Sequence, residues 1–277
     1  FRFIFLIIIL NYLIFLSVYF FTSENKHLIF DKKIIEFNEH ENSRNYWESC
    51  STDRLVNIKN YCKIGNYDNK IFLVGDSHLF SLVNDLGEKL NKNDYELINL
   101  TAAGTLYGQE EDKRFIQGED KRINFLRNIK NSIFIFGGYY QRESKNDLDL
   151  LYIFYKEEFE IFLKNGNKII FLTPIPEINF DPTVDLLPVI KNKKTDVSIK
   201  KTKVINRNKF ATSFINNFNN INVLDLNNVF CDEFKCYAVT PEKIILKSDY
   251  DHASLEGAKI INDLIIKEIK KVETRLK

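Results

Sequence analysis

The sequence predicts an α/β fold: a three-layer α/β/α sandwich in which a parallel central sheet carries helices on both faces. From Lys70 onward, short apolar runs alternate with segments whose apolar residues recur at helical spacing, an order typical of parallel strands joined by helices. The chain has 277 residues, enough for one large domain with an appendage or for two small domains. An apolar segment at its start predicts one transmembrane helix before the sandwich.

The first predicted strand, residues 70–74, is a short apolar run that Gly75 ends, as is typical of a buried strand. The next helix is expected at residues 79–90, where leucines and a valine recur at helical spacing. Further strands are expected at residues 95–100, 132–136, 168–172 and 222–226, and further helices at residues 122–129, 148–163, 205–218 and 255–272. Residues 177–204 show no clear periodicity and are more typical of an insertion or lid than of a linker.

Residues 3–22 form an almost uninterrupted run of Phe, Ile, Leu and Val. Twenty helical residues rise about 30 Å, which matches the hydrocarbon thickness of a bilayer, so we expect a transmembrane helix. An uncleaved signal-like segment is the alternative, although the run ends without a cleavage site. Arg2 precedes the run and favours a cytoplasmic N-terminal side with the rest of the chain exported. The chain holds no methionine and begins with Phe1, which we interpret as a fragment that lacks its N-terminal part.

Charge and motifs exclude several classes of function. Without Arg2, the chain carries 38 basic and 38 acidic residues. This balance lacks the positive surface that nucleic-acid binding requires, so we expect no nucleic-acid partner. The sequence contains no phosphate-binding loop, no dinucleotide-binding glycine motif and no metal-ligand cluster, so we expect no cofactor.

Four cysteines, Cys50, Cys62, Cys231 and Cys236, allow three pairings. The pairing Cys50–Cys62 and Cys231–Cys236 joins sequence neighbours and needs the least rearrangement of the chain. Two such disulfides agree with an oxidising compartment beyond the membrane. The spacings, with no histidine nearby, argue against a zinc site, and four ordinary buried thiols are the alternative.

The segment Val74-Gly75-Asp76-Ser77-His78 places a serine where the first predicted strand turns into a helix. The carboxyl edge of a parallel sheet is where open α/β sheets bind ligands, so the Ser77 hydroxyl is expected at the ligand site. Backbone N–H groups at the start of the helix point to the same place and favour negative charge. Asp and Ser are also good helix caps, so this motif alone does not establish catalysis.

Four histidines could serve as a base for Ser77. His27 and His40 lie near the membrane segment and in the polar connection, and His78 is the immediate neighbour of Ser77, so its side chain is expected to point elsewhere. His252 remains, just before the last helix, and Asp249 is placed to accept a hydrogen bond from its second ring nitrogen. Asp251 competes for that role, but adjacent side chains rarely achieve the geometry.

These residues resemble the SGNH (GDSL-type) hydrolase superfamily, and more narrowly the exported SGNH domain fused behind the membrane part of acyltransferase family 3 proteins. Three blocks carry the resemblance: residues 72–78, the pair Cys231 and Cys236, and residues 249–258. It implies an SGNH/flavodoxin-like domain at residues 70–277, a connecting subregion at residues 23–69, and a transmembrane helix at residues 1–22 as the last span of a truncated membrane part.

The resemblance implies that Ser77 is the nucleophile, His252 the base and Asp249 its orienting carboxylate. It places oxyanion donors at the backbone N–H groups of Ser77 and Gly104. The third strand departs from the superfamily, because residues 136–142 (FGGYYQR) lack the asparagine that donates to the oxyanion. Residues that could line the pocket instead are Asp76, Tyr139, Tyr140 and Gln141.

The expected function is O-acyl transfer, with acetyl as the acyl group, to a cell-surface polysaccharide such as lipopolysaccharide through an acyl-serine. Its implied partners are the membrane, a membrane acyltransferase domain that delivers the acyl donor, and a glycan acceptor. Residues 23–277 are then expected on the periplasmic, extracytoplasmic side of the inner membrane. A membrane-anchored carbohydrate esterase with the same three residues and a non-catalytic glycan-binding module are the alternatives.

Overall fold

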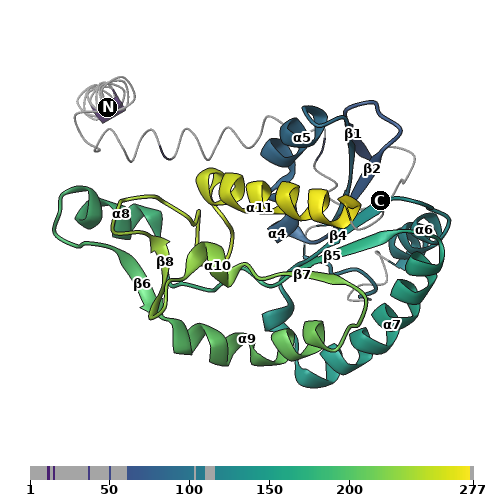
Figure 1. Ribbon diagram of the computed structural model, residues 1–277. Helices are drawn as coiled ribbons and strands as arrows, with labels where there is room; N and C mark the ends of the chain where they lie inside the picture. The colour runs from purple at the N-terminus through teal and green to yellow at the C-terminus, as the bar shows by residue number, and fades with distance from the viewer. Residues whose placement is uncertain are drawn as a thin grey trace, which may run out of the picture.

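The computed structural model describes residues 11, 12, 15, 37, 50, 61–102, 104–109 and 116–274. A six-stranded sheet with strand order β1-β3-β2-β4-β5-β7 forms the centre of the fold (Figure 1). Its strands are β1 (Cys62–Ile64), β2 (Lys70–Gly75), β3 (Glu96–Thr101), β4 (Ile133–Phe136), β5 (Lys168–Leu172) and β7 (Asn222–Leu224). Strands β2, β3, β4, β5 and β7 pair in parallel, as the alternation of apolar runs and helical patterns predicted.

Strand β1 is antiparallel to β3, so the expectation of a purely parallel sheet is wrong at this edge. Cys62 of β1 lies opposite Asn99 of β3 and is disulfide-bonded to Cys50. An edge strand that no helical crossover introduces is free to run antiparallel. With three residues, it is too short to show a periodic pattern in the sequence.

Two layers of helices cover the sheet, because successive side chains of each strand point to opposite faces. Ile71 and Leu73 of β2 join one apolar cluster, whereas Phe72 and Val74 join the other. The first cluster includes residues of α4 (Ser77–Phe80), α5 (Val83–Asn91), α10 (Asn227–Phe230) and α11 (Leu255–Thr274). The second includes residues of α6 (Ile116–Arg127), η3 (Tyr140–Arg142), α7 (Lys145–Lys164) and α9 (Lys201–Asn216). The three layers expected from the sequence are therefore present.

The stretch without periodicity, residues 177–204, contains regular structure. It holds α8 (Pro182–Ile190) and β6 (Val197–Lys200), and β6 pairs antiparallel with β8 (Lys235–Val239). Figure 1 shows α8, β6 and β8 grouped beside α10 at one end of the molecule. A separate apolar cluster packs this insertion against β8, and the Cys231–Cys236 disulfide closes the turn that leads into β8.

The predicted transmembrane helix at residues 1–22 lies almost wholly outside the described residues, of which it contains only three. Within the part of the chain that the structure describes, no helix has the length and apolar character needed to cross a membrane. Most of the predicted connecting subregion, residues 23–69, also lies outside the described residues.

Candidate active site

The candidate site begins at the carboxyl end of β2, which lies between β3 and β4 within the sheet. Asp76 caps α4 there, because its carboxylate accepts a hydrogen bond from the His78 N–H at 2.9 Å. The same carboxylate accepts a 2.8 Å bond from the Tyr139 N–H, which follows β4. A Cβ on Gly75 would lie 2.1 Å from the Gly137 carbonyl oxygen, so the β2 and β4 ends approach as closely as they do only with glycine at this position. Two neighbouring strands thus hold the Ser77 turn.

The structure brings Ser77 and His252 into contact although 175 residues separate them. The Ser77 Oγ lies 2.9 Å from Nε2 of His252, within reach for proton transfer. His252 stands in the loop between β8 and α11. The Nδ1 atom of the same ring lies 3.0 Å from Oδ2 of Asp249. Asp249 also fixes this loop, because its Oδ1 accepts the backbone N–H of His252 at 2.7 Å and of Asp251 at 3.0 Å. Hydroxyl, imidazole and carboxylate therefore form one hydrogen-bonded series.

The charges around His252 favour its protonated form. Burial acts to lower the pKa of His252, but hydrogen bonds and charge from Asp249 and Asp251 outweigh it and raise that pKa to about 9. For Asp249, burial acts to raise the pKa, and the hydrogen bonds with His252 more than offset it, so the pKa falls below its ordinary value. The ion pair keeps Asp249 ionised and makes the imidazolium a stable state.

Two residues that the sequence reasoning set aside also belong to this cluster. Asp251 Oδ1 lies 2.8 Å from His252 Nδ1, so a second carboxylate faces the imidazole. This contact lacks the alignment of a hydrogen bond, whereas that of Asp249 has it. The His78 ring stacks on the His252 ring with centroids 4.3 Å apart. Adjacency in sequence gave no signal of this stacking, which depends on a contact across 174 residues.

Among the described residues, His78, Asp251 and His252 form the one cluster with metal-ligand atoms close together, within 4.8 Å of one another. Imidazole lone pairs lie in the plane of the ring. Because the two rings are stacked and only 16° from parallel, these lone pairs do not converge on a common point. The geometry is that of charged groups packed together rather than of a metal centre.

The remaining residues predicted for the site include Gly104, Tyr139 and Gln141, and each has its own set of contacts. Gly104 is exposed in the turn after β3, with φ of 71°, and its carbonyl accepts a 2.8 Å bond from Arg142. Tyr139 stacks on His78 and its hydroxyl bonds Glu177. Gln141 donates to the Ile175 carbonyl at 3.0 Å.

Two of the residues predicted to line the pocket are buried. Tyr140 is fully buried, and its hydroxyl pairs with Tyr155 in the core, so no part of it reaches the surface. Asp76 is 1% exposed and is occupied by its bonds to the amides of His78 and Tyr139. Asp76 therefore supports the site from within the structure, whereas Tyr140 belongs to the core and does not line a pocket.

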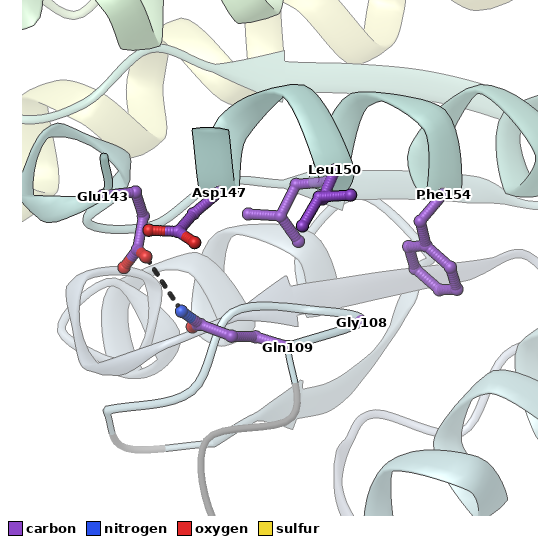
Figure 2. A pocket seen from close by; sticks show the side chains of 7 residues that line it. Gly108, Gln109, Glu143, Asp147, Leu150 and Phe154 are labelled. Atoms are coloured by element: carbon purple, nitrogen blue, oxygen red, sulfur yellow. Dashed lines mark hydrogen bonds between the residues drawn. The ribbon is translucent and has the colours of Figure 1, made fainter. Parts of the chain in front are cut away.

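A cavity of about 400 Å³ lies between the loop after β3 and the start of α7. Figure 2 shows the polar side chains of Gln109, Glu143 and Asp147 at one end and the ring of Phe154 at the other. Gln109 donates to Glu143 at 3.0 Å, as the dashed line marks. The cavity is lined by Gly108, Gln109, Glu143, Asp147, Leu150, Leu151 and Phe154. This lining includes neither Ser77 nor His252.

Comparison with known proteins gives the family. A protein-family model described as the SGNH domain fused to AT3 domains matches residues 49–267. The periplasmic domain of a lipopolysaccharide acetyltransferase from Salmonella ser. Paratyphi A is similar in structure, with 18% identity and a TM-score of 0.65, over 86% of this chain and 97% of that one.

Two weaker structural similarities are a proposed acylhydrolase from Bacteroides fragilis and a GDSL-like lipase from Bacteroides thetaiotaomicron. The first has 17% identity and a TM-score of 0.46, over 76% of this chain and 91% of that one. The second has 14% identity and a TM-score of 0.42, over 86% and 99%. No curated protein matches the sequence. The match over residues 49–267 shows that the chain belongs to the SGNH domain family whose members are fused to AT3, acyltransferase family 3, domains.

Proposed function

We propose that this chain is an O-acyltransferase domain that moves an acyl group, in the first instance acetyl, onto an exported cell-surface polysaccharide. The observation that carries the proposal is the 2.9 Å contact between Ser77 Oγ and His252 Nε2, with Asp249 on the opposite ring nitrogen. A hydroxyl becomes nucleophilic when an oriented base accepts its proton, and these three groups meet that requirement.

In the first half of the reaction, neutral His252 accepts the Ser77 proton at Nε2 as Ser77 Oγ bonds to the acyl carbonyl carbon. The tetrahedral oxyanion then collapses, the bond to the donor's leaving group breaks, and that group takes the proton from His252. Ser77 is left as an ester. Asp249 holds the proton on Nδ1 throughout, so that Nε2 is the free base. The backbone N–H groups of Ser77 and Gly104 are the proposed oxyanion donors.

In the second half, a sugar hydroxyl gives its proton to His252 Nε2 and attacks the acyl-serine. Collapse of the second oxyanion releases the sugar ester, and His252 returns the proton to Ser77 Oγ. Water in place of the sugar would give an esterase with the same residues. Partial exposure of Ser77 and His252 leaves the series accessible to donor and acceptor.

The family and the similar structure support transfer and its location. The family is described by its fusion to AT3 domains, which supports a membrane acyltransferase part as the source of the acyl group. The similar Salmonella domain is a periplasmic part of a lipopolysaccharide acetyltransferase. We therefore place residues 23–277 on the periplasmic side of the inner membrane, behind a transmembrane helix at residues 1–22.

The test is Ser77→Ala in the membrane-bound protein as the cell produces it, with surface polysaccharide acetylation as the measurement. Ser81→Ala is the matched control, because this serine lies one helical turn away and its hydroxyl donates to the His78 carbonyl. We expect S77A to abolish acetylation and S81A to retain it. Unchanged acetylation in S77A would refute the acyl-serine, and increased acetylation would favour the esterase.

A further inference from the structure

The site contains a second histidine, His78, that the proposed reaction does not use. Its ring is buried, with 4% of the residue exposed. The Nδ1 atom lies 3.1 Å from Oδ1 of Asp76, which anchors one edge of the ring. The Nε2 atom lies 3.6 Å from Oδ2 of Asp251, at the other edge. His78 therefore stands between two buried carboxylates.

Two further rings hold His78 by its faces. The His252 ring is stacked on it at 4.3 Å and 16°, and the Tyr139 ring at 4.8 Å and 22°. Tyr139 is itself held by two hydrogen bonds: its backbone N–H donates to Asp76, and its hydroxyl donates to Glu177. Any movement of the His78 ring would therefore displace the ring of His252.

Asp251 connects the two histidines through separate oxygen atoms. Its Oδ1 lies 2.8 Å from His252 Nδ1 and its Oδ2 lies 3.6 Å from His78 Nε2, while 3% of the residue is exposed. Within the described part of the chain, His78 Nε2 and Asp251 Oδ1 have no aligned hydrogen-bond partner. One buried negative charge is thus shared by two imidazoles.

We propose that His78 is a positioning residue: it orients Asp251 and the His252 ring, and it limits how strongly Asp251 stabilises the protonated form of His252. The consequence for turnover rests on the proposed function, whereas the consequence for the titration of His252 does not.

The sign of the effect follows from the groups that face this cluster. Burial acts to lower the pKa of His78, but Asp251 and Asp76 outweigh it and raise that pKa. A positive His78 repels a positive His252 and draws part of the Asp251 charge to itself, so both effects oppose protonation of His252. The remaining charged or titratable neighbours are Asp249, Lys247, Glu177, Tyr139 and Tyr250. None of these side chains is itself replaced in a variant of His78 alone.

Two substitutions separate the two edges of the ring. In His78→Gln, the side-chain amide nitrogen reaches the position of Nε2 and still presents an N–H to Asp251. In His78→Asn, the shorter amide reaches only the position of Nδ1 and Asp76. Both variants remove the positive charge of His78, so any difference between them reports the contact with Asp251: if His78 acts through Asp251, the Gln variant keeps the behaviour of His252 closer to wild type than the Asn variant does.

The experiment is an NMR titration of ring-labelled histidine in the full chain, with the His252 signal assigned from a His252→Gln variant. Because removing a charge within about 4–6 Å changes a pKa by about one pH unit or more, we expect H78N to raise the pKa of His252 by about one pH unit. H78Q loses the same charge but keeps an N–H directed at Asp251, so we expect it to raise the pKa of His252 by less than H78N does. The acid limb of kcat/KM for p-nitrophenyl acetate should move with the titration, and kcat should fall more than KM changes.

Asp251→Asn completes the test and does not depend on the folding of the His78 variants. It should lower the pKa of His252. H78N should then change this pKa less when it is added to D251N than when it is made in the wild-type chain. If the pKa of His252 is the same in H78N and in D251N as in wild type, the proposal is overturned, even if activity falls. A His252 pKa that responds in a chain without Ser77-dependent turnover would uphold it while refuting the proposed function.

Discussion

Asp249→Asn is the perturbation that most sharply probes the orientation of His252. Asparagine keeps an oxygen at the Oδ1 position, which accepts the backbone N–H groups of Asp251 and His252, so the loop conformation is retained. What changes is the 3.0 Å contact between Oδ2 and His252 Nδ1. An amide N–H in that place favours a bare Nδ1, which puts the proton on Nε2, facing Ser77 Oγ.

The size of the loss follows from the two carboxylates at Nδ1. Where a single aspartate orients the histidine, the same substitution in a serine protease lowers kcat about 10⁴-fold. Here Asp251 remains 2.8 Å from Nδ1 and still favours the productive tautomer, although without hydrogen-bond alignment. We therefore expect D249N to lower the plateau value of kcat by about 10²–10³-fold, which corresponds to about 3–4 kcal/mol.

The assay is p-nitrophenyl acetate turnover by the full chain as a function of pH, with Asp251→Asn as the matched control. Both variants lose one negative charge near His252, so both should move the acid limb of kcat/KM to lower pH, by about one pH unit. Only D249N should also lose most of the plateau rate, and D251N should stay within about tenfold of wild type. Comparison at the plateau removes the change in protonation.

A D249N plateau within about tenfold of wild type, together with a larger loss in D251N, would refute this assignment and make Asp251 the orienting carboxylate. Loss of both plateaus without a change in the pH limb would refute the electrostatic part of the reasoning. As controls, circular dichroism and urea unfolding would test whether each variant retains its fold.

Two further predictions concern stability. Gly75→Ala should lower the free energy of unfolding by more than about 2 kcal/mol, because the new Cβ would lie 2.1 Å from the Gly137 carbonyl oxygen. Gly104→Ala should lower it by about 1 kcal/mol, because a Cβ there meets no atom within 4 Å but the residue has a φ of 71°. Urea unfolding measures both losses, and equal losses would refute the predicted clash at Gly75. Burial lowers the pKa of Lys247 to about 7, so the contribution of Lys247 to stability rises as the pH increases from 7 toward 10.5. The pKa of His252 is raised to about 9, so the contribution of His252 to stability falls as the pH increases from 6.5 to about 9. The two slopes oppose each other between pH 7 and 9. Lys247→Met should therefore leave stability falling through that window, and a pH dependence unchanged from wild type would contradict the assignment.

The centre of the sheet was predictable because strands β2, β3, β4 and β5 are buried on both faces. Residues 70–74 and 168–172 read as short apolar runs and correspond to β2 and β5. The insertion was not predictable in this way, because β6 is half-exposed and its residues pair with β8 residues that lie 35 to 42 positions further along the chain. That pairing and a shared apolar cluster, rather than a local pattern, hold it in place.

The site shows the same division. Ser77, His252 and Asp249 were chosen because their chemistry is complementary, and the structure places them in contact, while their catalytic roles remain a proposal. His78 and Asp251 were set aside on local geometry. Local geometry describes neighbours in sequence, whereas these side chains are oriented by the packing of the β2 turn against the loop before α11.

The most direct test of the account is mass spectrometry of the acyl-enzyme. The full chain and its Ser77→Ala variant would be mixed with p-nitrophenyl acetate, quenched in acid and digested. We predict one acetyl group on Ser77 in the quenched wild-type chain and none at position 77 in Ser77→Ala. Turnover in wild type with no acetyl on Ser77, or equal turnover in S77A, would contradict it.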